Sequence, residues 1–203
     1  MDGIKSKFPP FQIRDLPHHI AMYQSLESPR LLLRKAVPTD LEDIYHNVWN
    51  DEELLSFTLW RRSDCLEEAR ERLERNFAYQ KKNPYIYFIE EKSSHEVIGF
   101  GGVLDMGEGV ISEGGLCIAR KWQSKGYGKE LLALLLDFAF LELGAKEFRY
   151  SYFKGNERSA SLCAKYPFVH LETVAVEDAP RPHLQEMEVF TLTRDAFLAY
   201  KGL

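Results

Sequence analysis

One short segment limits what this chain can fold into more than any other, because glycines there separate a strand pattern from a helix pattern. Residues 110–118 before it are partly apolar and predict a strand. Residues 131–141 after it are apolar except for Asp137 and predict a buried helix. Gly126 and Gly128 lie between them in a loop that opens this helix. A helix N-terminus offers unpaired N–H groups and the positive end of the helix dipole, so the loop predicts a phosphate site.

Two common nucleotide-binding loops do not fit this segment. A Walker loop needs Ser or Thr after its Gly-Lys pair, and Glu130 follows Lys129 here. A dinucleotide fingerprint needs a third glycine where Leu131 stands, within an early strand–helix–strand unit. The pattern that remains is Gln-x-x-Gly-x-Gly, starting at Gln123. Taken alone, it fits a simple turn as well as it fits a phosphate site.

Hydrophobic periodicity predicts strands and helices along the rest of the chain. Strands are expected over residues 31–37, 85–90, 97–104, 110–118, 146–153, 168–176 and 184–193. Helices are expected over about 39–50 (capped by Thr39 or Asp40), from Ser63 past Leu73, from Glu130 to Leu141 and over 156–166. The order β-α-α-β-β-β-α-β-α-β-β predicts an α/β (α+β) fold, a mixed, mainly antiparallel sheet of about seven strands with helices on both faces.

The N-terminal residues differ in character from the rest. Residues 1–28 are rich in proline and show no sustained period, so we expect an arm with one short helix near residues 18–26. Residues 29–203 are expected to form one domain, because 203 residues suit a single domain with a substantial core.

The composition excludes several classes of protein. Hydrophobic residues make up 45% and charged residues 28%, which excludes a disordered chain. The net charge of −5 argues against a nucleic-acid binder, although Lys121, Lys125 and Lys129 form a basic patch around the loop. The apolar run over 131–141 is too short for a bilayer, which takes about 20 residues, and the N-terminus lacks an apolar signal core. We expect a cytoplasmic protein that binds neither nucleic acid nor membrane.

Neither the cysteines nor the histidines predict a metal site. Cys65, Cys117 and Cys163 are odd in number, with no CxxC pair and no neighbouring histidine cluster, so reduced thiols are expected rather than disulfides or zinc. His18, His19 and His46 show no metal-ligand spacing and are expected to be structural.

Three blocks in the right order give the chain a family resemblance. They are Gln123-x-x-Gly126-x-Gly128, the order of elements around it, and Asn156-Glu-Arg-Ser159-x-x-Leu162-x-x-Lys165-x-Pro-Phe168. With them, residues 28–198 resemble the GNAT superfamily of N-acetyltransferases. The runs Ser28-Pro-Arg-Leu-Leu-Leu-Arg34 and Val189-Phe-Thr-Leu-Thr-Arg-Asp195 are similar to the branch that acetylates ribosomal-protein α-amines, the RimJ/RimL type.

The resemblance implies acetyl-CoA as cofactor. Backbone N–H groups of the loop would hold the pyrophosphate, where two glycines leave room for close approach, and Lys125 or Lys129 would add screened attraction. The pantetheine arm would bind like an extra strand beside the strand at 110–118. The implied cofactor residues are Leu116, Cys117, Ile118, Gln123, Ser124, Lys125, Gly126, Tyr127, Gly128, Lys129, Asn156 and Ser159.

The implied chemistry is direct attack of a neutral amine on a thioester. Deprotonating a lysine ε-amine costs roughly 4–5 kcal/mol near pH 7, whereas an α-amine costs about 1 kcal/mol. Glu113, ten residues before Gln123, matches a glutamate of the branch and is the candidate general base, directly or through water. The alternatives are an exposed strand carboxylate and a carboxylate that orients another group. An N–H group of residues 116–118 would stabilise the developing oxyanion.

The chain departs from the family pattern at two positions. Many members carry a tyrosine seven residues after the motif asparagine, where it protonates the departing thiolate, and Cys163 stands there in this chain. A buried apolar cysteine is the preferred interpretation over an acid, and Tyr166 is not assigned the role. Pro167 replaces the usual glycine before Phe168. Asn156 either contacts the cofactor or caps its helix, and both roles are compatible.

Specificity is expected in loops near the acceptor amine. The candidates are Trp60, Arg61, Arg62, Arg181 and His183. Arginines there would suit an acceptor that carries a carboxylate, and solvated surface charge is the alternative for each of them.

The function expected is therefore an acetyl-CoA-dependent N-acetyltransferase that acts on a protein or peptide α-amine or on a small amine, as in antibiotic- or polyamine-type enzymes. The alternatives are a catalytically silent acyl-CoA-binding module and a loop that binds another phosphate ligand such as a nucleotide. The acceptor and the choice between monomer and homodimer stay open.

Overall fold

The computed structural model describes residues 23–203. Its strands are β1 Ser25–Glu27, β2 Leu31–Arg34, β3 Ile86–Glu91, β4 Val97–Gly107, β5 Val110–Ile118, β6 Glu147–Phe153, β7 Val169–Ala175 and β8 Glu186–Thr193. Its helices are α1 Leu41–Ile44, α2 Glu52–Leu55, α3 Leu66–Lys82, α4 Tyr127–Asp137, α5 Glu157–Cys163 and α6 Arg194–Lys201. A π-helical turn extends α1 over Tyr45–Trp49, and another extends α4 over Phe138–Glu142.

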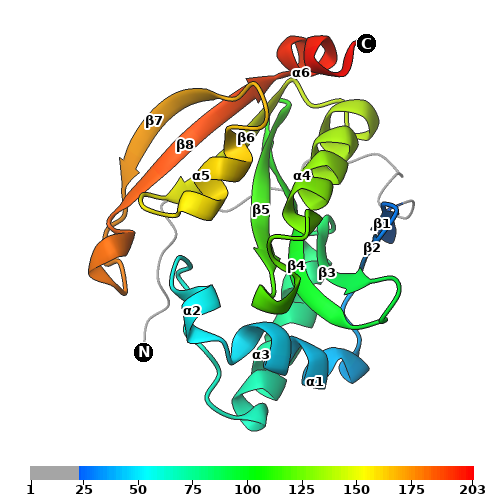
Figure 1. Cartoon of the computed structure of the whole chain (residues 1–203), viewed down its shortest axis with the longest axis vertical. Helices are drawn as coiled ribbons and strands as arrows, with labels where there is room; N and C mark the ends of the chain where they lie inside the picture. The colour runs from blue at the N-terminus through cyan, green and yellow to red at the C-terminus, as the bar shows by residue number, and fades with distance from the viewer. Residues whose placement is uncertain (1–22) are drawn as a thin grey trace.

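All the strands form one sheet, in the order β1-β2-β3-β4-β5-β6-β8-β7 (Figure 1). Neighbouring strands are antiparallel except for β5 and β6, which are parallel. The predicted mixed, mainly antiparallel sheet is therefore confirmed. It has eight strands instead of about seven, because β1 pairs with the outer edge of β2.

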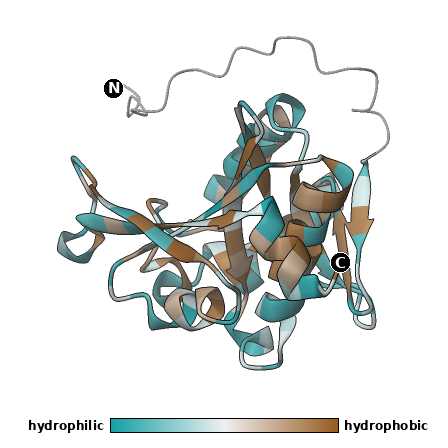
Figure 2. Ribbon diagram, turned by 90° about the horizontal axis from the view of Figure 1, so that it is seen from above, coloured by the Kyte–Doolittle hydropathy of each residue, from teal (hydrophilic) through white to brown (hydrophobic). Residues whose placement is uncertain are grey.

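Helices cover both faces of this sheet. Phe88 and Ile89 are successive residues of β3 and so point to opposite faces. The ring of Phe88 contacts Trp49, which follows α1, with centroids 5.9 Å apart. A Cβ placed on Gly101 would lie 3.3 Å from Ile89 and 3.4 Å from Leu131 of α4, so Ile89 faces that helix. Figure 2 shows hydrophobic segments gathered in the middle of the molecule, between these layers.

Several element boundaries differ from the prediction. The helix expected near residues 18–26 is wrong for residues 23–26, where β1 begins, and residues 18–22 lie outside the described part. The helical segment expected from Thr39 or Asp40 begins at Pro38, and the Asp40 carboxylate accepts the N–H of Val37 at 2.8 Å. α3 begins at Leu66 and not at Ser63.

Two short helices were not predicted, although their caps stand in the sequence. The Asp51 side chain accepts the N–H of Leu54 at 2.9 Å and starts α2. Thr193 accepts the N–H of Ala196 at 3.3 Å and starts α6. Each element is short enough that its apolar residues show little periodicity, which is why the pattern missed them.

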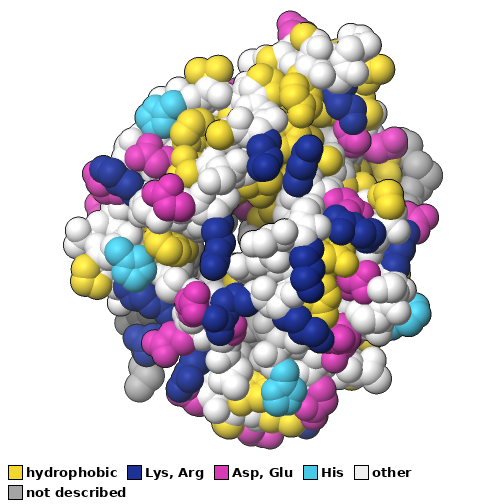
Figure 3. Space-filling model, viewed as in Figure 1, with side chains coloured by type: hydrophobic (Ala, Val, Ile, Leu, Met, Phe, Trp, Pro, Cys, Tyr) yellow, Lys and Arg dark blue, Asp and Glu magenta, His cyan; other side chains and the backbone are white. Residues whose placement is uncertain are grey.

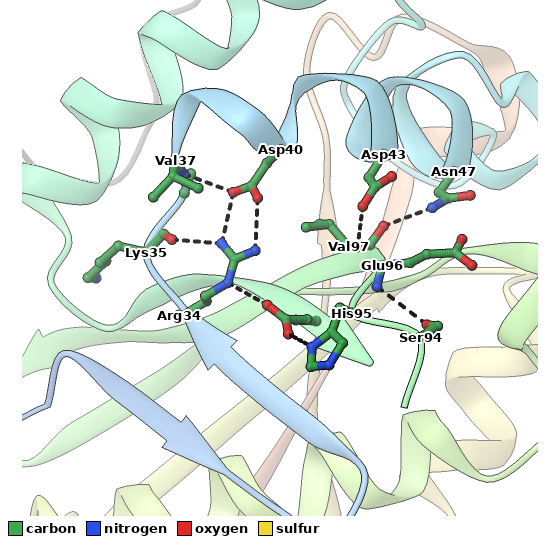
Figure 4. Close-up of polar contacts among 12 residues, drawn as sticks. Arg34, Lys35, Val37, Asp40, Asp43, Asn47, Ser94, His95, Glu96 and Val97 are labelled. Carbon is green, nitrogen blue, oxygen red and sulfur yellow. Dashed lines mark hydrogen bonds and ion pairs between the residues drawn. The ribbon is translucent and has the colours of Figure 1, made fainter. Parts of the chain in front are cut away.

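A buried ion network ties β2, β3 and the first helix together. Arg34 donates two hydrogen bonds to Asp40, at 2.8 and 2.9 Å, and one to Glu90 at 2.7 Å. Figure 4 shows Arg34 and Asp40 pointing toward each other from strand and helix. Asp40 is only 4% exposed. Burial alone would raise the pKa of Glu90, but hydrogen bonds from Arg34 and His95 outweigh it and lower that pKa.

Candidate active site

The sheet opens where its two parallel strands diverge. β5 pairs with β6 only from Val110 to Ser112, and beyond Ser112 the two strands separate. A cavity of about 550 Å³ lies in the opening, and we call it the β5–β6 cavity. It is lined by residues of β5, by β6 and α5, and by the segment from α2 to Trp60. Figure 3 shows a hollow near the middle of this face, with Lys and Arg side chains around it.

A β-bulge bends β5 at the place where it leaves β6. Val103 of β4 pairs with Glu113 and Gly101 pairs with Leu116, so β5 has one residue more than β4 in this stretch. The extra length is accommodated by Gly114 and Gly115. A side chain on Gly114 would meet Cδ1 of Ile86 at 2.4 Å, and Gly115 has φ +108°, which favours glycine. The bulge increases the local twist and helps to hold the two strands apart.

The backbone of β5 beyond the bulge faces the cavity on one edge. Leu116, Cys117 and Ile118 pair with β4 on the other edge, and no pairing with β6 reaches them. All three line the β5–β6 cavity. A strand with one unpaired edge is able to hydrogen-bond an extended ligand as it would another strand.

The glycine loop, Gln123 to Lys129, presents a row of unpaired donors, and its first residue, Gln123, lines the β5–β6 cavity. α4 begins at Tyr127, with Gly126 before it at φ +87°. Among residues 23–203, the N–H groups of Ser124 to Lys129 have no hydrogen-bond acceptor. Gln123 was predicted to bind the cofactor together with these residues. Its N–H group is not free, however, because it donates to the Arg120 carbonyl at 3.1 Å. Its side-chain amide donates to the Ile118 carbonyl at 2.8 Å and so ties the loop to β5.

Arg30 and Glu130 hold this loop in place, and neither was predicted as a site residue. Arg30 Nε donates to Glu130 at 2.6 Å, and its Nη1 donates to the Lys125 carbonyl at 3.0 Å. The same guanidinium lies 4.1 Å from the centroid of the buried Tyr127 ring. The only signal in the sequence was the block from Ser28 to Arg34, which carried a resemblance but no position in space.

The lysines around the loop differ in their contacts. Lys121 pairs with Glu96 at 3.2 Å. Lys125 and Lys129 are exposed and have no ion pair with any residue in the described range. These two side chains therefore leave a positive charge beside the unpaired N–H groups.

The start of α5 lines one side of the β5–β6 cavity. The Asn156 side chain accepts the N–H of Ser159 at 3.2 Å and caps α5, and both residues line the β5–β6 cavity. Cys163 is 3% exposed and does not line it. Burial raises the pKa of the Cys163 thiol to about 11, so this residue is a protonated part of the core. Tyr166 donates to the Lys129 carbonyl at 3.1 Å and joins α5 to α4.

Glu113 lies at the bulge, where the strands separate. Its carboxylate accepts the N–H of Gly115 at 2.7 Å and the hydroxyl of Ser151 at 3.2 Å, and it lines the cavity. Burial raises the pKa of Glu113, and the two hydrogen bonds offset only part of that effect. The carboxylate thus binds a proton more readily than an ordinary glutamate does, which suits a base that works near neutral pH.

Of the predicted acceptor residues, three lie beside a second cavity. This α3 cavity, of about 730 Å³, is lined by α3, by the sheet and by the loop that carries Trp60, Arg61 and Arg62. The rings of Trp60 and Phe100 contact each other with centroids 4.9 Å apart, and both residues line both cavities.

The other two predicted acceptor residues support a loop instead. Arg181 donates to the carbonyls of Leu55 and Thr58, at 3.3 and 2.9 Å, and His183 Nε2 lies 2.8 Å from the Ser56 carbonyl. Neither residue lines a cavity described above. Both side chains contact backbone carbonyl groups at the end of α2 and just after it. A sequence pattern does not reveal such contacts.

Two further findings bear on the class of protein. Within residues 23–203, no group of three His, Cys, Asp or Glu side chains is arranged to hold a metal ion. In the same range, no helix has the length and apolar character needed to cross a membrane.

Comparisons with known proteins agree with this geometry. The chain is 28% identical over 150 residues to the uncharacterized N-acetyltransferase YoaA of Bacillus subtilis (strain 168), a match that covers 72% of this chain and 84% of YoaA. The fold is similar to that of a GCN5-related N-acetyltransferase from Brucella melitensis, with TM-score 0.76, 15% identity, and 88% and 82% of the two chains covered. It is also similar to that of a putative ribosomal-protein-serine acetyltransferase from Vibrio cholerae, with TM-score 0.69, 20% identity, and 83% and 97% covered.

The family model described as the acetyltransferase (GNAT) domain matches residues 30–169. This range contains the glycine loop, and it contains Glu113 and Gly115 of the bulge, Gln123 and the α5 cap Asn156, which line the β5–β6 cavity. The chain therefore belongs to the GNAT acetyltransferase family.

Proposed function

We propose that the protein is an N-acetyltransferase that uses acetyl-CoA and transfers the acetyl group to a primary amine. One observation carries the proposal: the unpaired edge of β5 and Gln123 line one cavity, and the unpaired N–H groups of Ser124 to Lys129 follow Gln123 directly in the chain. A ligand with phosphates at one end and an amide-containing arm at the other suits both features.

The residues of the cavity fit such a ligand. Ser124 to Lys129 would bind the pyrophosphate through their N–H groups, with Lys125 and Lys129 supplying positive charge. The backbone of Leu116, Cys117 and Ile118 would hydrogen-bond the pantetheine arm. Asn156 and Ser159 would contact this arm from the α5 side. Acetyl-CoA supplies an acetyl group activated as a thioester.

Glu113 is proposed to take the proton from the amine, directly or through water. Its raised pKa supports this role, because a base accepts a proton best when its pKa lies near the working pH. A backbone N–H of residues 116–118 would stabilise the negative charge that develops on the thioester oxygen. Cys163 supplies no proton to the departing sulfur in this scheme, because it is buried away from the cavity.

Among amines, an α-amine of the RimJ/RimL type is the preferred acceptor. It loses its proton at a cost of about 1 kcal/mol near pH 7, so a single carboxylate of raised pKa is a sufficient base. The blocks at residues 28–34 and 189–195 support the same branch. A small-molecule amine is the competing acceptor within this class.

The proposal extends to the setting of the enzyme. We take residues 29–203 as the acetyltransferase domain and residues 1–28 as an arm that ends in β1. Three free cysteines and the use of acetyl-CoA suit the cytoplasm. Acetyl-CoA and the amine are the partners expected, for a monomer or a homodimer, with no role for nucleic acid or membrane.

Two measurements test this function. Acetyl-CoA and CoA should raise the unfolding temperature while ATP should not, and no shift with either CoA compound would remove the proposal. A thiol-release assay with peptide N-termini and small amines should then show turnover. CoA binding without turnover on a broad panel would favour a silent acyl-CoA-binding module, and a shift with ATP alone would favour a nucleotide site.

A further inference from the structure

The α3 cavity adjoins the site proposed for acetyl transfer. It shares Leu59, Trp60 and Phe100 with the β5–β6 cavity. It also reaches Gly114, the bulge residue next to Glu113. A molecule held in the α3 cavity therefore lies beside the proposed base and beside the cavity proposed for acetyl-CoA.

The charge of this cavity is positive, against the net charge of −5 of the whole chain. Its ionisable lining consists of Arg61, Arg62, Arg72, Arg75, Glu68 and Glu71. Arg62 is neutralised by Asp64 at 2.7 Å, and Arg75 lies 3.7 Å from Glu71. Within residues 23–203, Arg61 and Arg72 have no carboxylate partner. The cavity thus carries cations that the protein itself does not balance.

Arg72 is the more informative of these two cations, because it is held in place. Its guanidinium is half-buried between two indole rings, 4.7 Å from the centroid of Trp49 and 5.9 Å from that of Trp60. It donates one hydrogen bond, from Nη1 to the Arg61 carbonyl at 3.0 Å. A guanidinium has five N–H donors, so most of them have no partner in the described chain. Burial lowers the pKa of Arg72 to about 10, which shows how poorly its charge is compensated.

The face of α3 that carries Arg72 lines the same cavity as the bulge of β5. Arg72 and Tyr79 are two helical turns apart and both line the cavity. Gly114 of β5, the residue next to Glu113, lines this cavity as well. A molecule in this cavity is therefore able to contact the Arg72 guanidinium and to present its amine toward Glu113.

We propose that the α3 cavity binds the acceptor and that Arg72 selects a primary amine that also carries a carboxylate. The inference rests on the acetyl transfer proposed above and names the class of its substrate. Arg72 would bind the carboxylate with paired N–H donors, the geometry in which a guanidinium is most selective. The carboxylate belongs either to a free amino acid or to an acidic residue at a peptide N-terminus, and the test separates these sources.

The test compares Arg72→Gln with wild type on matched acceptors. One arm uses free amino acids and their amides, and the other uses amidated peptides that begin with Glu or Gln. At saturating acetyl-CoA, wild type should prefer the carboxylate-bearing member of one arm by about 10- to 100-fold in kcat/KM. Arg72→Gln should lose this preference, leaving the neutral acceptors within about twofold. Arg72→Lys should keep part of it, because it retains the charge but not the paired donors.

Arg70→Gln is the matched control. Arg70 lies on the same helix, is exposed, pairs weakly with Glu67 at 3.8 Å and does not line the cavity. It should behave as wild type with every acceptor. Thermal unfolding of each variant checks that Arg72→Gln is folded, and its KM for acetyl-CoA should be unchanged.

The outcomes separate this inference from the function on which it rests. Equal turnover of neutral and carboxylate-bearing amines by wild type, or equal losses for both in Arg72→Gln, would overturn the inference and leave acetyl transfer standing. Where no amine is turned over, binding decides: with CoA present, carboxylate-bearing amines should raise the unfolding temperature of wild type but not of Arg72→Gln. No such difference would also overturn the inference. Absence of CoA binding would refute the proposed function itself.

Discussion

At the scale of single residues, the site contains two ionisable side chains in surroundings that are unfavourable for a charge. Glu113 is a carboxylate whose pKa is raised by burial at a bulge. Arg72 is a guanidinium with no counter-charge in the described chain. In both, the protein tolerates an unfavourable charge, which is typical of groups that act on a ligand rather than stabilise the fold.

Glu113→Gln should lower the rate mainly at low pH. The base acts only when deprotonated, so the wild-type rate should rise with pH through the raised pKa of Glu113. The variant depends on amine that has already lost its proton. We expect kcat/KM to fall about 10²-fold near pH 6.5 and to approach wild type above the pKa of the amine.

The measurement for Glu113 is a pH–rate profile of both proteins with one α-amine acceptor. Gln at this position can still accept the Gly115 N–H, so the bulge should survive. Ser112→Ala, on the same strand, is a control expected to follow the wild-type profile. A Glu113→Gln profile that matches wild type across the whole pH range would exclude the residue as the base.

At the scale of elements, the start of α4 is built so that its donors stay free. Gly126 turns the chain with φ +87°, and the loop is anchored by Arg30, just before β2, and by Glu130 of α4. None of these contacts uses the N–H groups of Ser124 to Lys129. Side-chain hydrogen bonds thus hold the loop in place, and its backbone N–H groups remain available to a ligand.

The two loop glycines should respond differently to alanine. Gly128 lies in α4, and a Cβ there would meet only Leu162, at 3.9 Å, so Gly128→Ala should stabilise the free protein by up to about 1 kcal/mol. The added methyl should still weaken CoA binding, about tenfold or more, if phosphates approach the backbone there. Gly126→Ala should destabilise by about 1–2 kcal/mol, because of its positive φ.

Urea unfolding and calorimetric titration with CoA measure these two effects separately. If Gly128→Ala bound CoA as wild type does, the glycine would serve only the turn, and close approach of the phosphates at this residue would be refuted.

The ion network around Arg34 also holds several elements together. Arg34 joins β2 to β3 and to the turn that opens α1, and it neutralises the buried Asp40. Arg34→Gln should cost about 3–5 kcal/mol of unfolding free energy, because it leaves a buried charge unpaired.

Urea unfolding of Arg34→Gln is the measurement, with His46→Ala as control. His46 is exposed and lies 3.4 Å from an exposed Glu42, so its loss should change stability by less than about 0.5 kcal/mol. A change of similar small size in Arg34→Gln would show that the network contributes little.

At the scale of the whole molecule, the sheet divides the site into two cavities that meet at the bulge. The β5–β6 cavity is lined by the unpaired edge of β5 and by Gln123, which precedes the unpaired donors, and the α3 cavity is lined by the unbalanced arginines. The pair formed by Trp60 and Phe100 is common to both. Two ligands could then approach from separate cavities and meet beside Glu113.

Hydrogen exchange should distinguish the two cavities. CoA should slow exchange of the amides of Ser124 to Lys129 and of residues 116–118, because these N–H groups become hydrogen-bonded. Amides of α3 should change little. Protection confined to α3, with none in the loop, would contradict the assignment of the β5–β6 cavity to the cofactor.

Much of the fold could be predicted because its causes are local. The order of elements follows from periodicity, and the loop follows from Gly126 and Gly128 between a strand and a helix. The helix was expected from Glu130 but begins at Tyr127, since the first turn after a glycine cap shows no apolar period. α2, α6 and β1 were missed for the same reason, being too short for a pattern.

The site itself was only partly predictable, because its geometry depends on pairing between distant segments. By itself the sequence determined the kinds of element, and it led to the predictions that the loop binds an anion and that Glu113 is the base. Only the tertiary structure decided that Arg30 anchors the loop, that Arg181 and His183 support the segment after α2, and that Arg72 is left without a counter-charge. Local propensity acts between neighbours in the chain, whereas hydrogen bonds, burial and charge balance act between neighbours in space.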